Sequence, residues 1–201
     1  MTGTNGEIGG VRAVSEPRPS TLSNGQPHIA PRTRTLTGVQ ILGAGSYVPD
    51  NVVSNLHLQD SLGFDPEWIV GRTGIHERRF ALPHQATSDL CSEAAARCLE
   101  NADCDPADVD MLVLATFTPD MALPSTANLV QDRLKLNCAG FDIQAACAGF
   151  VFALVIGSQF VATGNSKRCL VVGGDCNSRV INPGDQKSYP LFGDGAGAVL
   201  L

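Results

Sequence analysis

From Gly38 onward, the pattern of apolar and polar residues predicts strands and helices that alternate along the chain. Short apolar runs bounded by turn residues are typical of strands that are covered on both faces. The chain carries such a run at residues 111–115, and we expect further strands at residues 39–42, 141–144, 170–173 and 198–201. Strands and helices that alternate in this way predict an α/β fold with a sheet between helical layers.

The segments between the predicted strands carry the signals of four helices. We expect them at residues 55–62, 87–101, 124–134 and 148–163. Thr87 or Ser88 would be a suitable N-cap for the second helix, because a hydroxyl accepts a hydrogen bond from a free amide of the first turn. Pro124 would open the third helix. The fourth is apolar nearly all round, which predicts a helix buried on every side.

Residues 1–37 differ from the rest of the chain in composition. They are rich in Gly, Pro, Ser and Thr and show no periodic apolar pattern. Such a segment buries too little apolar surface to offset the entropy lost on ordering, so we predict a disordered tail. A transit peptide is the alternative, and the acidic residues Glu7 and Glu16 argue against it. The second predicted region, residues 38–201, ends inside an apolar run, from which we expect a domain truncated at its C-terminal end.

Composition and charge exclude several classes of protein. The net charge of −6 at pH 7 argues against a nucleic-acid-binding protein. No apolar run approaches the roughly eighteen residues of a membrane helix, so we expect no association with a membrane. The seven cysteines are odd in number, follow no secretory signal and lack the spacing of a zinc site. We therefore expect free thiols in a cytoplasmic protein.

One cysteine, Cys147, lies where a nucleophilic cysteine is expected. Residues 140–150 contain a predicted strand, a tight turn of small residues, Cys147 and the start of the apolar helix. Free amides and the helix dipole at a helix N-terminus favour a thiolate, and the small neighbours leave room for a thioester to approach. The backbone amide there can donate to a developing oxyanion. A buried structural cysteine is the alternative that spacing alone leaves open.

Four segments of the chain resemble one enzyme family. Residues 145–150 (AACAGF) resemble the active-site stretch of the β-ketoacyl-acyl-carrier-protein synthase III enzymes, which belong to the thiolase-like superfamily. Residues 68–75 resemble the coenzyme A segment of that family, residues 192–198 its glycine-rich turn before a core strand, and residues 43–49 its opening segment. The resemblance covers essentially all of residues 38–201 and implies the N-terminal half of a layered α-β-α-β-α architecture.

The resemblance also implies a reaction. Cys147 would take an acyl group from acyl-coenzyme A, in the simplest case from acetyl-coenzyme A. Malonyl-acyl-carrier protein would then lose carbon dioxide and attack the acyl-cysteine, which starts fatty-acid synthesis. The family works as a homodimer and uses no metal and no redox cofactor. Its histidine and asparagine lie in the second half of the fold, so we expect residues 1–201 alone not to catalyse condensation.

Several further side chains acquire roles through the resemblance. Trp68 would stack on the adenine and Arg72 would bind coenzyme A phosphates, whereas without the motif they would be read as a core residue and an ion-pair partner. Another family arginine falls at Gln186, where the neighbouring Lys187 could substitute. Leu123 would reach across the dimer interface and line the acyl pocket of the partner.

The remaining polar candidates are interpreted as structural or solvated. Asp194 lies in a glycine-rich run that leads into a strand instead of a helix, which excludes a dinucleotide-binding loop and favours a structural role. The four histidines, His28, His57, His76 and His84, are expected to be solvated. Two alternatives to the synthase III function stay open. One is a related ketosynthase for polyketide or long-chain acyl condensation, and the other is a non-catalytic remnant that only dimerises.

Overall fold

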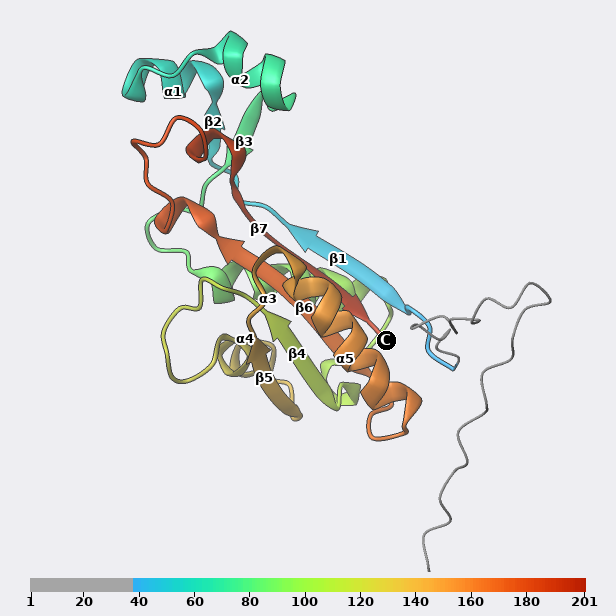
Figure 1. Ribbon diagram of the computed structural model, residues 1–201. Coiled ribbons are helices and arrows are strands. Elements are labelled where there is room, and N and C mark those ends of the chain that lie inside the picture. Colours follow the sequence, from blue (N-terminus) through green and yellow to red (C-terminus); the bar gives the residue numbers. More distant parts are fainter. Residues whose placement is uncertain (1–37) are drawn as a thin grey trace, which may run out of the picture. The chain divides into compact units, whose positions relative to one another are not determined.

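A five-stranded mixed sheet forms the centre of the computed structural model, which describes residues 38–201 (Figure 1). The strands are β1 (Gly43–Tyr47), β4 (Met111–Ala115), β5 (Ala139–Ile143), β6 (Cys169–Cys176) and β7 (Asp194–Leu200), and their order across the sheet is β1-β7-β6-β4-β5. β4 runs parallel to β5 and β6, whereas β7 runs antiparallel to both β6 and β1. The predicted α/β fold is confirmed.

Helices cover both faces of this sheet. α3 (Thr87–Asn101) and α4 (Thr126–Leu134) pack on one face, and α5 (Gly149–Ala162) packs on the other. Alternate residues of a strand point to opposite faces, so Leu112 and Leu114 of β4 join the α3 side, while Val113 joins the α5 side. The continuous apolar run at 111–115 thus belongs to a strand buried on both faces, as predicted.

A smaller module lies next to the sheet. It consists of the antiparallel ribbon β2 (Val52–Ser54) and β3 (Glu77–Arg79) together with α1 (Asn55–Leu62) and α2 (Pro66–Thr73). Its own core contains Val53, Leu58, Phe64 and Ile69. We call these four elements the α1–α2 module. The sequence predicted α1 correctly, but the ribbon and α2 were missed, although Asp65-Pro66 is a helix-start signal: the Asp65 carboxylate accepts hydrogen bonds from the amides of Glu67 and Trp68.

The predicted N-cap of α3 and the predicted start of α4 were wrong, although the bounds predicted for α3, residues 87–101, are confirmed. α3 begins after Ala86, whose amide donates to the Asp89 carboxylate at 2.6 Å, so neither Thr87 nor Ser88 is the N-cap. The hydroxyls of these two residues instead bind the loop that follows β4. α4 begins after Ser125, which caps the Asn128 amide, and not at Pro124.

The first predicted strand was also wrong. The structure has no strand at residues 39–42, and β1 instead begins at Gly43. A Cβ on Gly45 would lie 2.3 Å from the Ala94 carbonyl oxygen and from the Cys98 amide nitrogen. Glycine is therefore required because β1 passes directly against α3, and not because the chain turns.

Most of the glycine-rich run at residues 192–198 also lies within a strand and not in a turn before it. It was predicted to precede a strand at 198–201, but β7 starts at Asp194 and includes most of the run. The buried Asp194 carboxylate accepts hydrogen bonds from the Ala81 amide at 2.7 Å and from the Ser178 amide at 2.8 Å. Asp194 therefore has the structural role that the sequence suggested, as a link between three segments.

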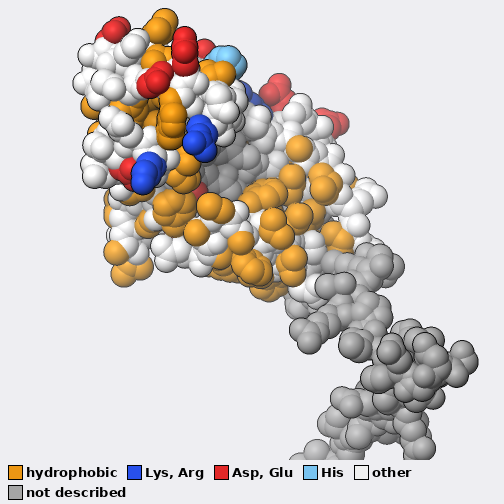
Figure 2. Space-filling model, turned by 45° about the horizontal axis from the view of Figure 1, so that its top comes forward, with side chains coloured by type: hydrophobic (Ala, Val, Ile, Leu, Met, Phe, Trp, Pro, Cys, Tyr) orange, Lys and Arg blue, Asp and Glu red, His pale blue; other side chains and the backbone are white. Residues whose placement is uncertain are grey.

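α5 is the largest departure from the sequence prediction. Its buried residues are Gly149, Ala153 and Gly157, all on the side that packs on the sheet. Val151, Phe152 and Val155 are 59%, 53% and 52% exposed, and Figure 2 shows hydrophobic side chains gathered over the face on which α5 lies in Figure 1. The prediction of a helix buried on every side is wrong for the part of the chain that the structure describes, because nothing described covers the outer face of α5.

Four short 3₁₀ turns complete the described elements. They are η1 (Pro106–Asp108), η2 (Ala146–Ala148), η3 (Asn177–Arg179) and η4 (Tyr189–Leu191). The predicted disordered tail and His28 lie outside the described residues. Among residues 38–201, no helix combines the length and the hydropathy that a membrane span requires.

Candidate active site

Cys147 lies at the sharp bend between β5 and α5. It is the middle residue of η2, two residues before the first residue of α5, which agrees with the predicted position next to a helix N-terminus. The preceding residue, Ala146, has a φ of 44°, which is rare for a residue with a Cβ. Backbone strain of this kind is found at functional sites, where the surrounding fold holds it in place.

The hydrogen bonds of this bend keep one amide available. The Ala148 amide donates to the Ala145 carbonyl at 3.1 Å, and the Gly149 amide donates to the Ala146 carbonyl. Neither bond uses the Cys147 amide, which is therefore a candidate donor to an oxyanion formed at a carbonyl attacked by the sulfur. A Cβ on Gly149 would lie 3.2 Å from the Ala115 Cβ, so a glycine here lets α5 begin close to β4.

Exposure separates Cys147 from the other cysteines. All seven cysteines lie in the described part of the chain, and Cys147 is the one that is exposed. Burial raises the pKa of Cys98 and of Cys176 to about 11 and that of Cys169 to about 12. The pKa of Cys91 is raised well above its usual value by burial and, to a smaller extent, by the Asp175 carboxylate. These four buried thiols are therefore poor nucleophiles, as expected of core residues.

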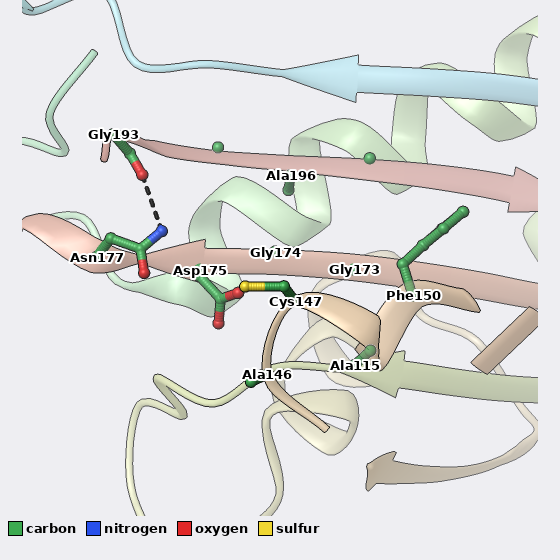
Figure 3. Close-up of a pocket in the computed structure, with 12 residues that line it drawn as sticks. Ala115, Ala146, Cys147, Phe150, Gly173, Gly174, Asp175, Asn177, Gly193 and Ala196 are labelled. Atoms are coloured by element: carbon green, nitrogen blue, oxygen red, sulfur yellow. Dashed lines mark hydrogen bonds between the residues drawn. The ribbon is translucent and has the colours of Figure 1, made fainter. Parts of the chain in front are cut away.

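A cavity of about 280 Å³ opens in front of Cys147 (Figure 3). Small residues form most of its wall, and its lining comes from the β5–α5 bend, the first turn of α5, β4, β6, η3 and the segment of β7 with the residue before it. The lining residues are Ala115, Ala146, Cys147, Phe150, Gly173, Gly174, Asp175, Asn177, Gly193, Gly195, Ala196 and Gly197. The glycine and alanine residues leave space for a thioester next to the sulfur. No histidine is among these described residues.

A second cavity, of about 360 Å³, lies beside the α1–α2 module. Its wall brings Trp68 of α2 together with Gln186 and Lys187, which come from the loop between η3 and η4. Trp68 is 41% exposed and does not belong to a core, in contrast to the alternative interpretation. Arg72 lies on the same helix, is exposed, and forms no ion pair with the described residues, but it does not line this cavity.

The comparisons with known proteins agree with these features. The family model described as 3-oxoacyl-[acyl-carrier-protein (ACP)] synthase III matches residues 141–201, which include Cys147. A β-ketoacyl-[acyl-carrier-protein] synthase III of Rhodopirellula baltica is 56% identical over 166 residues, which are 83% of this chain and 48% of that protein. The enzyme of the same name from Caldanaerobacter subterraneus is 50% identical over 80% of this chain and 49% of its own length.

Solved structures show the same similarity in three dimensions. The 3-oxoacyl-[acyl-carrier-protein] synthase III of Aquifex aeolicus superposes with a TM-score of 0.79 at 42% identity, over 81% of this chain and 53% of that one. The chain belongs to the β-ketoacyl-acyl-carrier-protein synthase III family. It spans about half the length of the curated synthase III relatives that it matches.

Another ketosynthase structure matches this synthase III chain nearly as well. The priming β-ketosynthase from the R1128 polyketide biosynthetic pathway has a TM-score of 0.78 at 38% identity, over 85% of this chain and 52% of its own. The resemblance predicted from the four motifs, and the thiolase-like α/β fold, are thus confirmed.

Two polar residues of the Cys147 cavity were missed in the sequence. Asp175 lies near the end of β6, and its Oδ1 accepts hydrogen bonds from Thr116 Oγ1 at 2.8 Å, from the Phe117 amide at 2.9 Å and from Thr118 Oγ1 at 3.1 Å. These bonds hold the segment that follows β4. Asn177 follows two residues later and donates from Nδ2 to the Gly193 carbonyl at 3.0 Å. A polar residue directly after a buried apolar strand was the available signal.

The structure places Leu123 away from the Cys147 cavity. It lies in the loop between β4 and α4 and is 84% exposed, so it is not the ordinary core residue that its type suggests. It does not line the Cys147 cavity within this chain. Its role across a dimer interface stays a prediction. His57, His76 and His84 are exposed, as the sequence predicted.

Proposed function

We propose that this synthase III chain accepts an acyl group from acyl-coenzyme A on Cys147, as the first step of a decarboxylative Claisen condensation. One observation carries the proposal: an exposed thiol lies at a strained bend before α5 and faces a cavity with small walls. The same bend offers the Cys147 amide as a donor. A nucleophile, an adjacent oxyanion donor and room for a substrate are the parts that acyl transfer needs.

The proposed transfer conserves the thioester. The Cys147 sulfur attacks the carbonyl carbon of the acyl-coenzyme A, and the resulting oxyanion is stabilised by the backbone amide. The carbon–sulfur bond to coenzyme A then breaks, coenzyme A leaves as the thiol with the proton from Cys147, and an acyl-cysteine remains. This exchange of one thioester for another requires neither a metal nor a redox cofactor.

In the second proposed step, malonyl-acyl-carrier protein loses carbon dioxide. Its carbanion attacks the acyl-cysteine, which yields a β-ketoacyl-carrier protein, releases Cys147 and begins a fatty-acid chain. Decarboxylation needs groups that stabilise an enolate, and the described lining of the cavity holds no histidine for that purpose. We therefore assign acyl transfer, and not decarboxylation, to the described residues. Acetyl-coenzyme A is the simplest primer.

The cavity beside the α1–α2 module is the proposed coenzyme A site. Trp68 presents a half-exposed indole on which an adenine can stack, and Lys187 brings a positive charge to the same cavity. Arg72, exposed on the same helix and without an ion-pair partner among the described residues, is free to reach a phosphate. We also propose a homodimer in which Leu123 lines the acyl pocket of the partner, a role that its exposed position supports.

The test is direct acylation. The natural full-length protein is incubated with acetyl-coenzyme A, and the mass of the intact protein and of its peptides is measured. We expect one acetyl group, on the peptide that contains Cys147, and none in the Cys147→Ser variant. Cys138→Ser, which alters a half-buried thiol outside the cavity, is the matched control and should still be acylated. A folded protein that takes up no acetyl group would favour the non-catalytic alternative.

A related priming reaction for polyketides is the second candidate. The similarity to the R1128 priming ketosynthase favours it, because that structure covers as much of this chain as the synthase III structures do. Both candidates share the acyl-cysteine. They are separated by the carrier protein that accepts the product, so competition between a fatty-acid carrier protein and a polyketide carrier protein would distinguish them.

A further inference from the structure

Arg78, on β3 of the α1–α2 module, is a buried arginine without a carboxylate partner. It is 6% exposed and forms no ion pair with the described residues. Its Nη1 donates to the Val53 carbonyl at 3.1 Å and its Nη2 donates to Oδ1 of Asn55 at 2.6 Å, while Nε is buried without a partner among these residues. Burying a charge is costly, and a hydrophobic side chain of similar size often fills such a position at lower cost. The guanidinium therefore points to a role in fixing a local geometry.

Asn55, the first residue of α1, extends the contact of Arg78 to a third segment. It is 5% exposed, and its side chain uses both ends: Oδ1 accepts from Arg78, and Nδ2 donates to the Ile75 carbonyl at 2.7 Å. Its backbone amide donates to the His76 carbonyl at 3.2 Å. Arg78 thus fixes the orientation of the Asn55 side chain, and Asn55 holds residues 75–76, which connect α2 to β3.

Residues 75–76 directly follow the C-terminal end of α2, in the region where Figure 1 labels α1, α2, β2 and β3. The end of the helix is closed by two bonds: the Gly74 amide donates to the Val70 carbonyl at 2.8 Å, and the Ile75 amide donates to Thr73 Oγ1 at 3.0 Å. Gly74 has a φ of 73°, which favours glycine. The last turn of α2 is therefore tied to the segment that Asn55 holds.

The same helix carries the two side chains of the proposed coenzyme A site. Trp68 and Arg72 are four residues apart, so they are neighbours on one side of α2. Ile69 is fully buried in the core of the module, which fixes the side of α2 that faces inward. A shift of the helix end would move both Trp68 and Arg72, and a binding group that is misplaced by about an ångström loses much of its effect.

From these contacts we propose that Arg78 and Asn55 are positioning residues, which fix the end of α2 and thereby the side chains that bind the adenine and the phosphates of acyl-coenzyme A. The inference rests on the coenzyme A site proposed above. Neither residue lines the Cys147 cavity or the cavity beside the α1–α2 module, so neither touches the substrate. Their loss should weaken the binding of the nucleotide part and leave the reaction at the Cys147 sulfur unchanged.

The experiment compares acetyl-coenzyme A with acetyl-pantetheine, which has the same thioester but lacks the adenine and the nucleotide phosphates. Each is offered to the natural full-length protein over a range of concentrations, and the rate of Cys147 acylation is measured by mass spectrometry. We expect acetyl-coenzyme A to reach half its maximal rate at a concentration at least about tenfold lower than acetyl-pantetheine, because a stacked base contributes to its binding.

Arg78→Lys keeps the positive charge but lacks the planar fork that reaches two acceptors. It should raise the half-maximal concentration of acetyl-coenzyme A about tenfold, because the groups that bind the nucleotide are misplaced. The maximal rate, and the whole response to acetyl-pantetheine, should stay within about twofold of the unmodified protein, since the thioester and the sulfur are unaffected.

Asn55→Asp is the second variant, and it breaks the other bond of the pair. The carboxylate still accepts from Arg78 but has no N–H to donate to the Ile75 carbonyl, so the same selective loss is expected. Arg97→Lys is the matched control. Arg97 also donates to a backbone carbonyl, that of Ser46, but it lies on α3 and lines neither cavity, so both thioesters should react as in the unmodified protein.

Each outcome decides the proposal. Equal losses for the two thioesters in the folded variants, or no loss for either, would overturn it, because a general effect on the fold does not distinguish the two substrates. Failure of both variants to fold would also overturn it, since the pair would then serve the whole fold and not α2. An unmodified protein that uses the two thioesters equally well would refute the proposed coenzyme A site and this inference with it. Absence of acylation by either thioester would instead refute the proposed acyl transfer, on which both depend.

Discussion

Helices α3 and α5 cover opposite faces of the same sheet, but their surroundings differ. α3 carries charged and polar residues on its outer side and buries Leu90, Cys91 and Cys98 against the strands. α5 has a nearly continuous apolar sequence, and yet its outer residues Val151 and Phe152 are more than half exposed. The more hydrophobic helix is therefore the less buried one.

The difference shows that the amphipathic pattern of α3 matches the described fold, whereas the pattern of α5 does not. A surface helix usually has a polar outer side, and large exposed apolar patches mark surfaces that another structure covers. α5 also begins at the bend that holds Cys147. Whatever covers α5 would thus lie near Cys147, the proposed nucleophile, while the cysteines of α3 stay enclosed. Four predictions test this contrast, from the largest expected effect to the smallest.

Replacing the thiol at the start of α5 should have the largest effect. Cys147→Ser in the natural full-length protein should lower acyl transfer from acetyl-coenzyme A by at least about a thousandfold, because the attacking sulfur is lost. Cys91→Ala, on α3, should retain most of the activity and lose some stability, since Cys91 is buried. Rates of thioester exchange and denaturant unfolding would show both results. Comparable losses of activity in the two variants would contradict the contrast.

Alkylation distinguishes the same thiols without mutation. With iodoacetamide at pH 8, Cys147 should be labelled first. Cys98, whose pKa is raised to about 11 by burial, has only about one thiolate in a thousand molecules at that pH. Peptide mapping after short exposure measures the order of labelling. The labelling of Cys98 should rise as the pH approaches 11, because the thiolate forms above the pKa. Earlier labelling of Cys98 or Cys176 would remove the basis for choosing Cys147.

The two helix faces should also differ in stability. Leu90→Ala leaves a cavity in the α3 core and should cost about 2–5 kcal/mol of unfolding free energy. Val155→Ala, on the exposed side of α5, should change the unfolding free energy of the 201-residue chain by less than about 0.5 kcal/mol. Urea denaturation of the two variants gives the comparison. A large loss for Val155→Ala would mean that the outer face of α5 is already covered in this chain.

Leu123 is an exposed apolar residue outside α5, and changing it should have a smaller effect, on the preference between acyl groups. In the natural full-length protein, Leu123→Phe should shift the preference toward short acyl groups, because a bulkier ring shortens the proposed pocket of the partner. Each methylene that no longer fits should cost about 1–3 kcal/mol. Competition between acetyl-coenzyme A and longer acyl thioesters measures the ratio. An unchanged ratio would remove Leu123 from the acyl pocket.

Local signals were sufficient for much of the fold and for the position of Cys147. The apolar run at 111–115 became β4, the helix at 55–62 became α1, and the bend of small residues placed Cys147 before α5. These features depend on neighbours in the sequence, through hydrophobic periodicity, capping and residue size. The same is true of the family resemblance, whose motifs are short and continuous.

The rest depended on residues far apart in the chain. From the sequence alone, Gly45 would be assigned to a turn, whereas the structure shows that it is needed because α3 packs against it. Asn177 belongs to no sequence motif that would predict its position in the wall of the Cys147 cavity. Trp68 and Lys187 line one cavity because α2 and the loop between η3 and η4 meet there. The hydrophobicity of α5 is a property of its sequence, but which of its sides is exposed is determined by the sheet that it packs on. Contacts between distant segments carry no local periodicity, so only the tertiary structure decided them.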